Sequence, residues 1–264
     1  MKMNQITGGE LIFEQHSAVR WILFNRPRQR NALTWAMYDG LIAVCRQVNA
    51  DPTIRAMVLA GADHVFAAGT DIAQFRDFKT EQDAMDYEAH GNQVMGALES
   101  VRVPVIAAIA GACTGAGAAI ASCCDVRIAA PSARFGVPIA RTLGNCLSHQ
   151  NYARLVALLG FSRAREILMT GRLMDAEELR AAGSVAEVVA EEQLFDRAQE
   201  LAESIAANAP LTLQATKQAM TRVRNRLFPV EDDADIIRMC YMSQDFREGM
   251  ESFLAKRKPS WRGE

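Results

Sequence analysis

The sequence predicts an α/β fold, because segments typical of β-strands alternate with helical segments up to about residue 190. Only helical patterns follow, so we expect an α/β body over residues 1–195 and a helical C-terminal region over residues 196–264. The stretch 103–125 (VPVIAAIAGACTGAGAAIASCCD) carries no charged side chain before its last residue. It is long enough to span a membrane, but its early proline and its glycine-rich interruption favour a strand, a turn and a buried helix.

The composition is that of a globular protein without a basic surface field. Hydrophobic residues make up 50% of the 264 residues, charged residues make up 23%, and the formal net charge is -2. We therefore expect neither nucleic acid nor a membrane as a partner. The six cysteines form no Cys-x-x-Cys pair and the four histidines lack metal-ligand spacing, which predicts reduced thiols and no metal site. The polar N-terminus has no signal-peptide core, so we expect a cytoplasmic protein.

The N-terminal part of the chain predicts a strand pair followed by helices and one buried strand. Residues 10–25 are expected to form two strands around a polar turn, and the basic loop 25–33 (NRPRQRNAL) follows them. Thr34 is a suitable N-cap for the next helix. Residues 55–61 (RAMVLAG) show no polar alternation and predict a strand that is buried on both faces, whereas residues 78–100 predict a helix.

The central stretch predicts a glycine-rich turn between a strand and a helix. Gly111, Gly115 and Gly117 permit a positive φ and let a ligand approach bare backbone. The helix after the turn presents unpaired N–H groups and the positive end of its dipole. Such a turn suits an anion, or an oxygen atom that becomes one, although close packing of a strand on a helix is the alternative interpretation.

The remaining segments continue the alternation and then end it. Residues 126–136 (VRIAAPSARFG) predict a strand and a turn. Residues 151–160 and 162–171 predict two helices that each end at a glycine, and residues 175–189 predict a helix followed by a short strand. From residue 191 onward we expect helices alone.

Three motifs occur in an order that resembles one family. NRPRQRNAL follows the second strand, FAAGTDI follows the third, and IAAIAGACTGAGAAIASCCDVRIAA contains the glycine turn. Together they resemble the crotonase superfamily of enoyl-CoA hydratases and isomerases, and further similarity (FG-P, TGR-MDAEE, EGM-SFLAKRKPSW) extends over nearly the whole chain. This resemblance implies a core of repeated ββα units wound into a spiral, with a helical C-terminal region that drives trimerisation. It also implies an acyl-CoA thioester as ligand, no further cofactor, and a homotrimer or a dimer of trimers.

The resemblance assigns an oxyanion hole to two backbone groups. Family members hold an enolate-like thioester oxygen with two backbone N–H groups, and the matching positions here are Thr70 and Ala116. Backbone amides at a tight turn and at a helix start cannot rotate away, which suits this task. The substrate-side positions implied by the same resemblance are Arg28, Arg30, Ala68, Asp71, Ile72, Gly115, Ile139 and Lys256. For the arginines and the lysine, a solvated surface charge is the alternative; Asp71 is also expected to brace the loop of Thr70.

Both catalytic glutamates of the family's hydratases are absent from this chain. Their positions are occupied by Ala119, in AGAAIA, and Ile139, in FGVPI. Neither side chain can accept or donate a proton, so the sequence argues against a simple hydratase mechanism.

The segment 140–155 departs from the common family pattern and supplies other candidates. It is similar to a region in which dehalogenase-type members place a nucleophilic aspartate after a Gly-Asn pair, and here Asn145 is followed by Cys146. Cys146 could be a nucleophile if a helix N-terminus lowered its pKa, or it could be a small wall residue. A histidine titrates near neutrality, which makes His149 a candidate for proton transfer. Further candidates are polar residues (His90, Arg141 and Ser148) and pocket-lining residues (Phe75, Met95, Leu143 and Tyr152).

Three functions remain open from the sequence. The first is an acyl-CoA enzyme of the hydratase/isomerase family that stabilises a thioester enolate. The second is another thioester reaction on the same oxyanion hole, such as hydrolysis, dehalogenation or isomerisation. The third is an acyl-CoA-binding homologue without hydratase activity. We also expect trimers, because the helical tail carries apolar side chains that need cover: Ile236, Ile237, Met239 and Met242.

Overall fold

A computed structural model describes residues 9–264 as a mixed α/β structure with a helical C-terminal region, which confirms the predicted fold class. The strands are β1 (Leu11–His16), β2 (Val19–Phe24), β3 (Ala56–Gly61), β4 (Val105–Ile109), β5 (Ala112–Thr114), β6 (Val126–Ala129), β7 (Arg134–Gly136), β8 (Met174–Asp175) and β9 (Glu187–Val188). The α-helices are α1 (Trp35–Ala50), α2 (Glu81–Glu99), α3 (Ala116–Cys123), α4 (Ile139–Thr142), α5 (His149–Leu159), α6 (Phe161–Thr170), α7 (Ala176–Ala181), α8 (Leu194–Ala206), α9 (Pro210–Leu227), α10 (Ala234–Tyr241) and α11 (Gln244–Leu254). Short 3-10 helices, including η1 (Pro27–Gln29) and η3 (Ile72–Asp77), join some of these elements.

The strands form two sheets that the chain visits in turn. The larger sheet has the order β1-β2-β3-β4-β6-β9, with an antiparallel β1–β2 hairpin and parallel pairs elsewhere. The smaller sheet has the order β5-β7-β8. The chain passes from β4 in the larger sheet to β5 in the smaller one and then into α3, and it repeats this path through β6, β7 and α4. These repeats are the ββα units that the resemblance implied.

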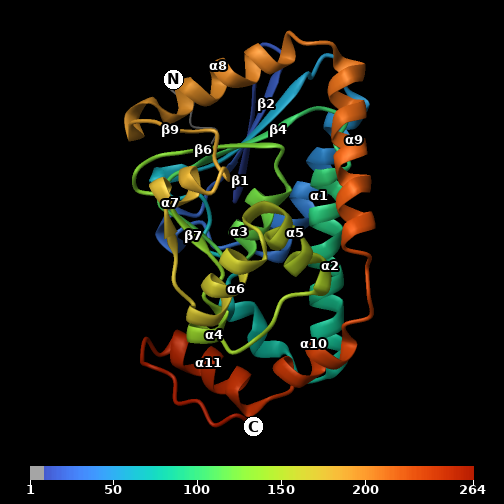
Figure 1. Ribbon diagram of the computed structural model, residues 1–264. Helices are drawn as coiled ribbons and strands as arrows, with labels where there is room; N and C mark the ends of the chain where they lie inside the picture. Colours follow the sequence, from blue (N-terminus) through green and yellow to red (C-terminus); the bar gives the residue numbers. More distant parts are fainter. Residues whose placement is uncertain (1–8) are drawn as a thin grey trace.

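The buried strand predicted from RAMVLAG is β3, and its two faces meet different helices. Met57 and Leu59 pack into the main core with α1 and α2. Val58 points the other way and packs against α8. Because successive side chains of a strand point to opposite faces, burial of every residue requires layers on both sides of the sheet. Figure 1 shows α8 across one end of the molecule, with α9 along one side.

The stretch 103–125 forms β4, β5 and α3, so it does not span a membrane. No helix among residues 9–264 is long and apolar enough to cross one. The short strands β5 and β8 were not predicted: GACTGAG was expected to be a turn throughout. Both strands are too short to show a periodic pattern, and they are held by long-range pairing with β7.

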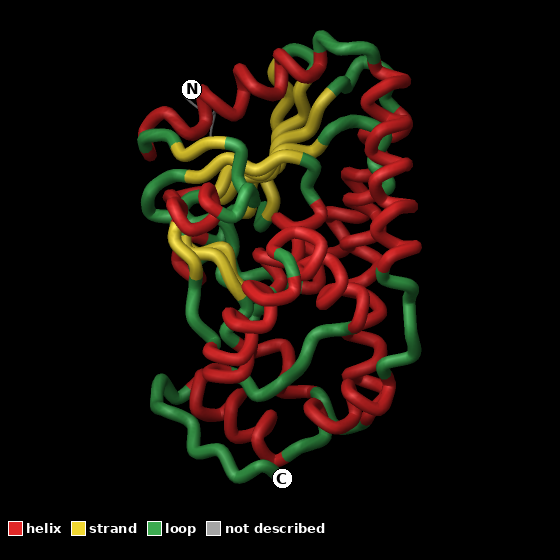
Figure 2. The backbone as a smooth tube through the Cα atoms, in the orientation of Figure 1, coloured by secondary structure: helices red, strands yellow, loops and turns green. Residues whose placement is uncertain are grey.

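The C-terminal region is helical to Leu254, and α10 and α11 lie beyond the strands at the end opposite α8 (Figure 2). The prediction of helices alone is wrong for residues 255–264, which fold back on α11 through Arg257–Glu248 and Gly263–Asp245 hydrogen bonds. The expectation that Ile237 needs outside cover is also wrong, because it is buried within the chain, whereas Met239 is exposed. The division at residue 195 falls in the first turn of α8, and it stays a prediction.

Candidate functional site

Two tight turns bring the backbone of Gly69 next to that of Gly115 and Ala116. Gly69 has φ +106° and Gly115 has φ +55°, conformations that side chains rarely allow. A Cβ atom on Gly115 would lie 3.5 Å from Gly69 Cα, and one on Gly69 would lie 3.9 Å from Ala116 N. The turns therefore touch backbone to backbone, and Ala116, which follows Gly115, lies beside Gly69, which precedes Thr70.

Backbone hydrogen bonds fix both turns. Asp71 N–H donates to Leu33 O at 2.9 Å on one side of the first turn, and Leu33 N–H donates to Gly69 O at 2.8 Å. Gly115 N–H donates to Gly136 O at 3.0 Å in the second turn. A Cβ atom on Gly117 would lie only 2.3 Å from a backbone oxygen of the first turn. The start of α3 can therefore approach the first turn only because residue 117 is glycine.

The two backbone N–H groups at these turns are free. Within residues 9–264, neither Thr70 N–H nor Ala116 N–H donates to a protein acceptor. Ala116 is the first residue of α3, where N–H groups have no partner inside the helix. Two neighbouring, rigidly held and unpaired amides can stabilise an oxygen atom that gains negative charge.

The side chain of Thr70 is held by two phenols. Its Oγ1 lies 2.8 Å from Tyr38 Oη on α1 and 2.9 Å from Tyr87 Oη on α2. Burial raises the pKa of Tyr38 to about 12, and burial also raises the pKa of Tyr87 well above its ordinary value. Both phenols therefore stay neutral near pH 7 and anchor the loop. This cluster could not be predicted from the sequence, because its three hydroxyls come from distant segments.

Aromatic rings form a wall beside the hydroxyl cluster. The Trp35 ring lies 5.4 Å from the Tyr87 ring, and the Phe75 ring lies 5.0 Å from it. Phe75 and Leu143, both predicted to line the pocket, belong to one cluster that α10 and α11 cover. Met95 instead lies in the main core.

Ala119 and Ile139, which occupy the positions of the missing glutamates, have apolar side chains and apolar surroundings. Ala119 is buried in α3, and Ile139 is partly buried at the start of α4. Both pack against the main hydrophobic core. These two positions therefore offer neither a base to activate water nor an acid to return a proton.

A buried carboxyl that sequence analysis missed lies on α2. Glu88 is only 6% exposed and accepts hydrogen bonds from Tyr241 Oη at 2.6 Å and Ser148 N–H at 3.1 Å. Burial raises the pKa of Glu88 to about 7. Asn145 Nδ2 donates to Tyr241 Oη at 3.0 Å, so the candidates Asn145 and Ser148 meet at this carboxyl. Glu88 gave no signal in the sequence because it sits among other charged residues of a helix.

Cys146 and His149, two further candidates from the sequence, have different surroundings in the structure. A hydrogen bond with Cys240 and burial raise the pKa of Cys146, which opposes the thiolate form that a nucleophile needs. His149 begins α5, and its backbone N–H donates to Asp233 Oδ2 at 2.5 Å. The His149 Nδ1 atom is buried, and no described residue binds it. His90 lies away from both, with Nε2 3.0 Å from Asp39 Oδ1.

Two of the expected CoA contacts are joined by a backbone hydrogen bond, and the others are exposed. Ala68 N–H donates to Arg30 O at 3.1 Å, so these two positions are adjacent, and Arg28 is exposed in the same loop. Lys256 is exposed just after α11, and no hydrogen bond or ion pair joins it to those residues within the described chain.

Two residues at the first turn have clear structural tasks. Asp71 accepts a bond from Ala73 N–H at 3.1 Å and forms an ion pair with Arg26 at 2.9 Å, as a brace for the loop should. Ile72 begins η3 and packs partly buried against the aromatic cluster.

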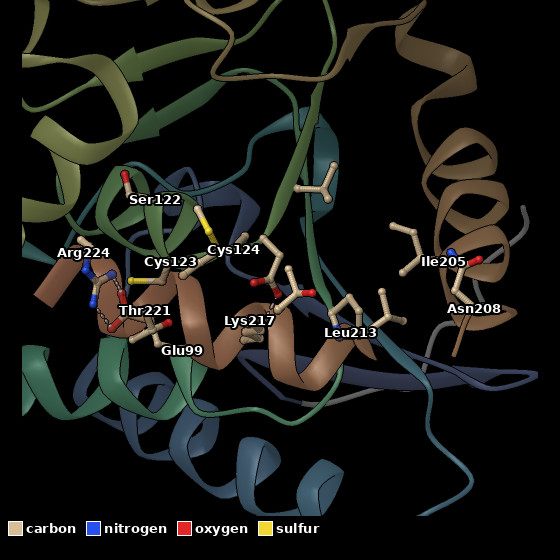
Figure 3. Close-up of a pocket in the computed structure, with 15 residues that line it drawn as sticks. Glu99, Ser122, Cys123, Cys124, Ile205, Asn208, Leu213, Lys217, Thr221 and Arg224 are labelled. Carbon is tan, nitrogen blue, oxygen red and sulfur yellow. Dashed lines mark hydrogen bonds and ion pairs between the residues drawn. The ribbon is translucent and has the colours of Figure 1, made fainter. Parts of the chain in front are cut away.

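A pocket of about 510 Å³ lies elsewhere, between α9 and the end of α3 (Figure 3). Its charges are paired, because Lys217 Nζ lies 2.8 Å from Asp125 Oδ2 and Arg224 bonds Glu99. Neither Thr70 nor Ala116 lines it. The pocket is therefore separate from the two turns.

Comparison with known proteins gives consistent similarities. The family model described as "Enoyl-CoA hydratase/isomerase" matches residues 14–264. A crotonyl-CoA hydratase of Syntrophomonas wolfei is 33% identical over 256 residues, covering 95% of this chain and 97% of that protein. A short-chain-enoyl-CoA hydratase of Clostridium acetobutylicum is 32% identical, covering 98% and 97%. Among solved structures, a methylmalonyl-CoA decarboxylase in complex with 2-nitronate-propionyl-CoA superposes with a TM-score of 0.87 at 27% identity, covering 96% of this chain and 98% of that one.

Proposed function

This chain belongs to the enoyl-CoA hydratase/isomerase family, and we propose that it holds the thioester oxygen of an acyl-CoA between Thr70 N–H and Ala116 N–H. The observation that carries this proposal is the pair of free amides at two touching turns. When an enolate forms, negative charge develops on the thioester oxygen, and donors that are already in place need no reorganisation. One such donor typically contributes about 3 kcal/mol of transition-state stabilisation.

We propose that hydration is not the main reaction. Hydration needs a water activated at the β-carbon and a proton delivered to the α-carbon. Ala119 and Ile139 can neither activate the water nor deliver the proton, and both residues pack in apolar surroundings. The enolate-forming part of the family's chemistry therefore has support in this chain, whereas the water-handling part lacks its usual groups.

Decarboxylation is a second candidate, favoured by the same two residues. Loss of CO₂ from a 2-carboxyacyl thioester leaves its electron pair in the enolate, so no base is needed to form it. Apolar surroundings at Ala119 and Ile139 would disfavour the charged carboxylate and favour its loss as neutral CO₂. The similarity to methylmalonyl-CoA decarboxylase, at a TM-score of 0.87, is in line with this candidate.

Several further assignments belong to the same proposal. Arg28 and Arg30 would contact CoA phosphates, the Ala68 carbonyl would meet the adenine, and Lys256 would reach CoA from the tail. The enzyme would use no cofactor beyond the CoA of its substrate. It would act in the cytoplasm as a homotrimer or a dimer of trimers.

The test removes one donor while keeping the helix. Proline is well tolerated at the first helical position and has no N–H, so Ala116→Pro deletes the second amide specifically. We expect the affinity for 2-nitronate-propionyl-CoA, an anion that resembles the enolate, to fall about 10²–10³-fold in calorimetric titration. Ala176→Pro, at the first position of α7, is the matched control and should leave this affinity unchanged. Full affinity in a folded Ala116→Pro variant would show that the oxyanion assignment is wrong.

Turnover assays then separate the reactions. We expect crotonyl-CoA hydration, followed by loss of enone absorbance, to be slow, and CO₂ release from methylmalonyl-CoA to test the second candidate. Efficient hydration by the unmodified chain would contradict the proposal and direct attention to His149 and Glu88.

A further inference from the structure

Two cysteines that are far apart in the sequence meet where α10 covers the segment 143–148. The Cys146 thiol donates to Ile236 O at 3.6 Å, and that carbonyl lies one helical turn before Cys240 on α10. Cys240 packs against the same cluster that contains Cys146, and the two side chains lie close enough to interact. Both belong to the cluster beneath α10 and α11, so the pair joins two elements at the cover of the aromatic wall.

This pair differs chemically from the other cysteines. Burial raises the pKa of the thiols of Cys45, Cys113, Cys123 and Cys124, which makes them inert. The neighbouring Cys146 side chain instead lowers the pKa of Cys240 to about 7, and Cys240 is the only cysteine of the described chain that is not buried. An accessible thiolate with a second thiol in contact is the arrangement found in oxidation-sensitive cysteines.

We propose that Cys146 and Cys240 are a peroxide-sensitive dithiol that closes to a disulfide and fixes α10 against the segment 143–148. The Cys240 thiolate attacks one oxygen of hydrogen peroxide, the O–O bond breaks, and hydroxide leaves as water after protonation. The Cys146 thiol then attacks the sulfur of the resulting sulfenic acid as its proton passes to the leaving oxygen, and the S–O bond breaks with release of a second water. Two thiols lose two electrons to one peroxide, and two waters form.

The bond would add to contacts that already hold α10 at this place. Tyr241, next to Cys240 on α10, bonds Glu88 on α2 and Asn145 in the segment 143–148. The Tyr241 ring lies 6.1 Å from the ring of Tyr87, which bonds Thr70. The disulfide would therefore fix the cover over the aromatic wall that leads to the first turn.

The test treats the purified full chain with hydrogen peroxide and counts thiols in denaturant. We expect loss of two of the six thiols, recovery of both with dithiothreitol, and one cross-linked peptide pair containing Cys146 and Cys240 in mass spectrometry. Cys146→Ser should leave no cross-link but a Cys240 sulfenic acid that dimedone traps. Cys45→Ser is the matched control and should still form the bond.

Three results would overturn the proposal. The first is a folded protein that keeps all six thiols under peroxide. The second is a cross-link between other cysteines or between chains. The third is Cys240 oxidised beyond the sulfenic acid while Cys146 stays reduced in the unmodified sequence. Because thiols and peptides are counted directly, the result does not depend on which acyl-CoA the enzyme uses.

Discussion

The turn that carries Thr70 and the helix α9 are held in place by different kinds of contact. The turn is fixed by backbone against backbone, with 3.5 Å between Gly69 Cα and a Cβ placed on Gly115. In α9, Lys217 is the only buried residue, and the helix is tied to the body through Lys217–Asp125 and Arg224–Glu99 ion pairs over a pocket. The turns of Thr70 and Ala116, where we propose the oxyanion hole, are therefore completed by the chain itself, whereas α9 leaves exposed apolar side chains that a second copy could cover.

The largest expected effect concerns that uncovered surface. Leu211, Met220, Val223 and Leu227 of α9 are all exposed. We expect light scattering to give a trimer or hexamer of the 29.0 kDa chain, and Met220→Glu with Val223→Glu to shift it toward monomers. Gln218→Glu adds a charge at an exposed polar position of the same helix and should leave the mass unchanged. A stable monomer of the unmodified chain at micromolar concentration would show that α9 needs no second copy to cover its apolar side chains.

The ion pair beneath α9 gives the next effect. Burial alone would raise the pKa of Glu99, but hydrogen bonds from Arg224 and Arg154 lower this pKa to about 2. Glu99→Ala leaves the buried Arg154 without its carboxylate, so we expect a loss of about 3–5 kcal/mol in the free energy of unfolding. Glu166→Ala, which breaks an exposed pair with Arg172, should lose less than about 1 kcal/mol. Similar losses in urea unfolding of both variants would mean that α9 gains little from this contact.

Glu88 adds a pH-dependent contact between α2 and the cover formed by α10. Its pKa is raised from 4.5 to about 7 in the folded state, so the folded chain holds the proton more tightly than the unfolded chain does. The resulting stabilisation, about 3 kcal/mol, is fully present below pH 4.5 and is lost as the pH rises through about 7. Glu88→Gln should flatten the unfolding free energy between about pH 4.5 and 7, whereas Asp86→Asn, exposed on the same helix, should not. Parallel profiles for Glu88→Gln and the unmodified chain would contradict the buried-acid assignment.

The smallest expected change in stability tests the turn. A Cβ atom at Gly117 would lie 2.3 Å from Ala67 O, so Gly117→Ala must push α3 away from the first turn. We expect a loss of about 1–3 kcal/mol in stability and, because the two amides separate, about 10²-fold weaker binding of 2-nitronate-propionyl-CoA. Gly91→Ala is the matched control, since nothing lies within 4 Å of a Cβ there, and it should stabilise α2 by up to about 1 kcal/mol. If the two substitutions had the same effect on this binding, close backbone packing would not be what aligns the amides.

The sequence predicted best what is encoded locally. Thr34 caps α1 by accepting a bond from Met37 N–H, and Gly115 takes the positive φ that its turn requires. The strand β3 was recognised because both of its faces are buried. These features depend on the conformational preference of one residue or on a short periodic pattern, so they can be seen without a partner segment.

What escaped prediction depends on segments that meet only in the folded chain. The burial of Glu88 results from contacts with Ser148 and Tyr241, which lie 60 and 153 positions away. The hydroxyl cluster at Thr70 likewise joins side chains from α1 and α2. The roles assigned to Arg28, Arg30 and Lys256 depend on a bound CoA and stay predictions.

The proposed oxyanion donors lie in the main chain, which has an evolutionary consequence. Of the coded amino acids, only proline lacks the N–H, so nearly every substitution at Thr70 or Ala116 retains the donor itself. In the proposed function, side chains at positions 119 and 139 decide instead whether water or a proton can be handled, and these side chains can change without touching the donors. A lineage can therefore keep its oxyanion hole while it exchanges one reaction for another, and installing Ala119→Glu with Ile139→Glu would retrace such an exchange toward hydration.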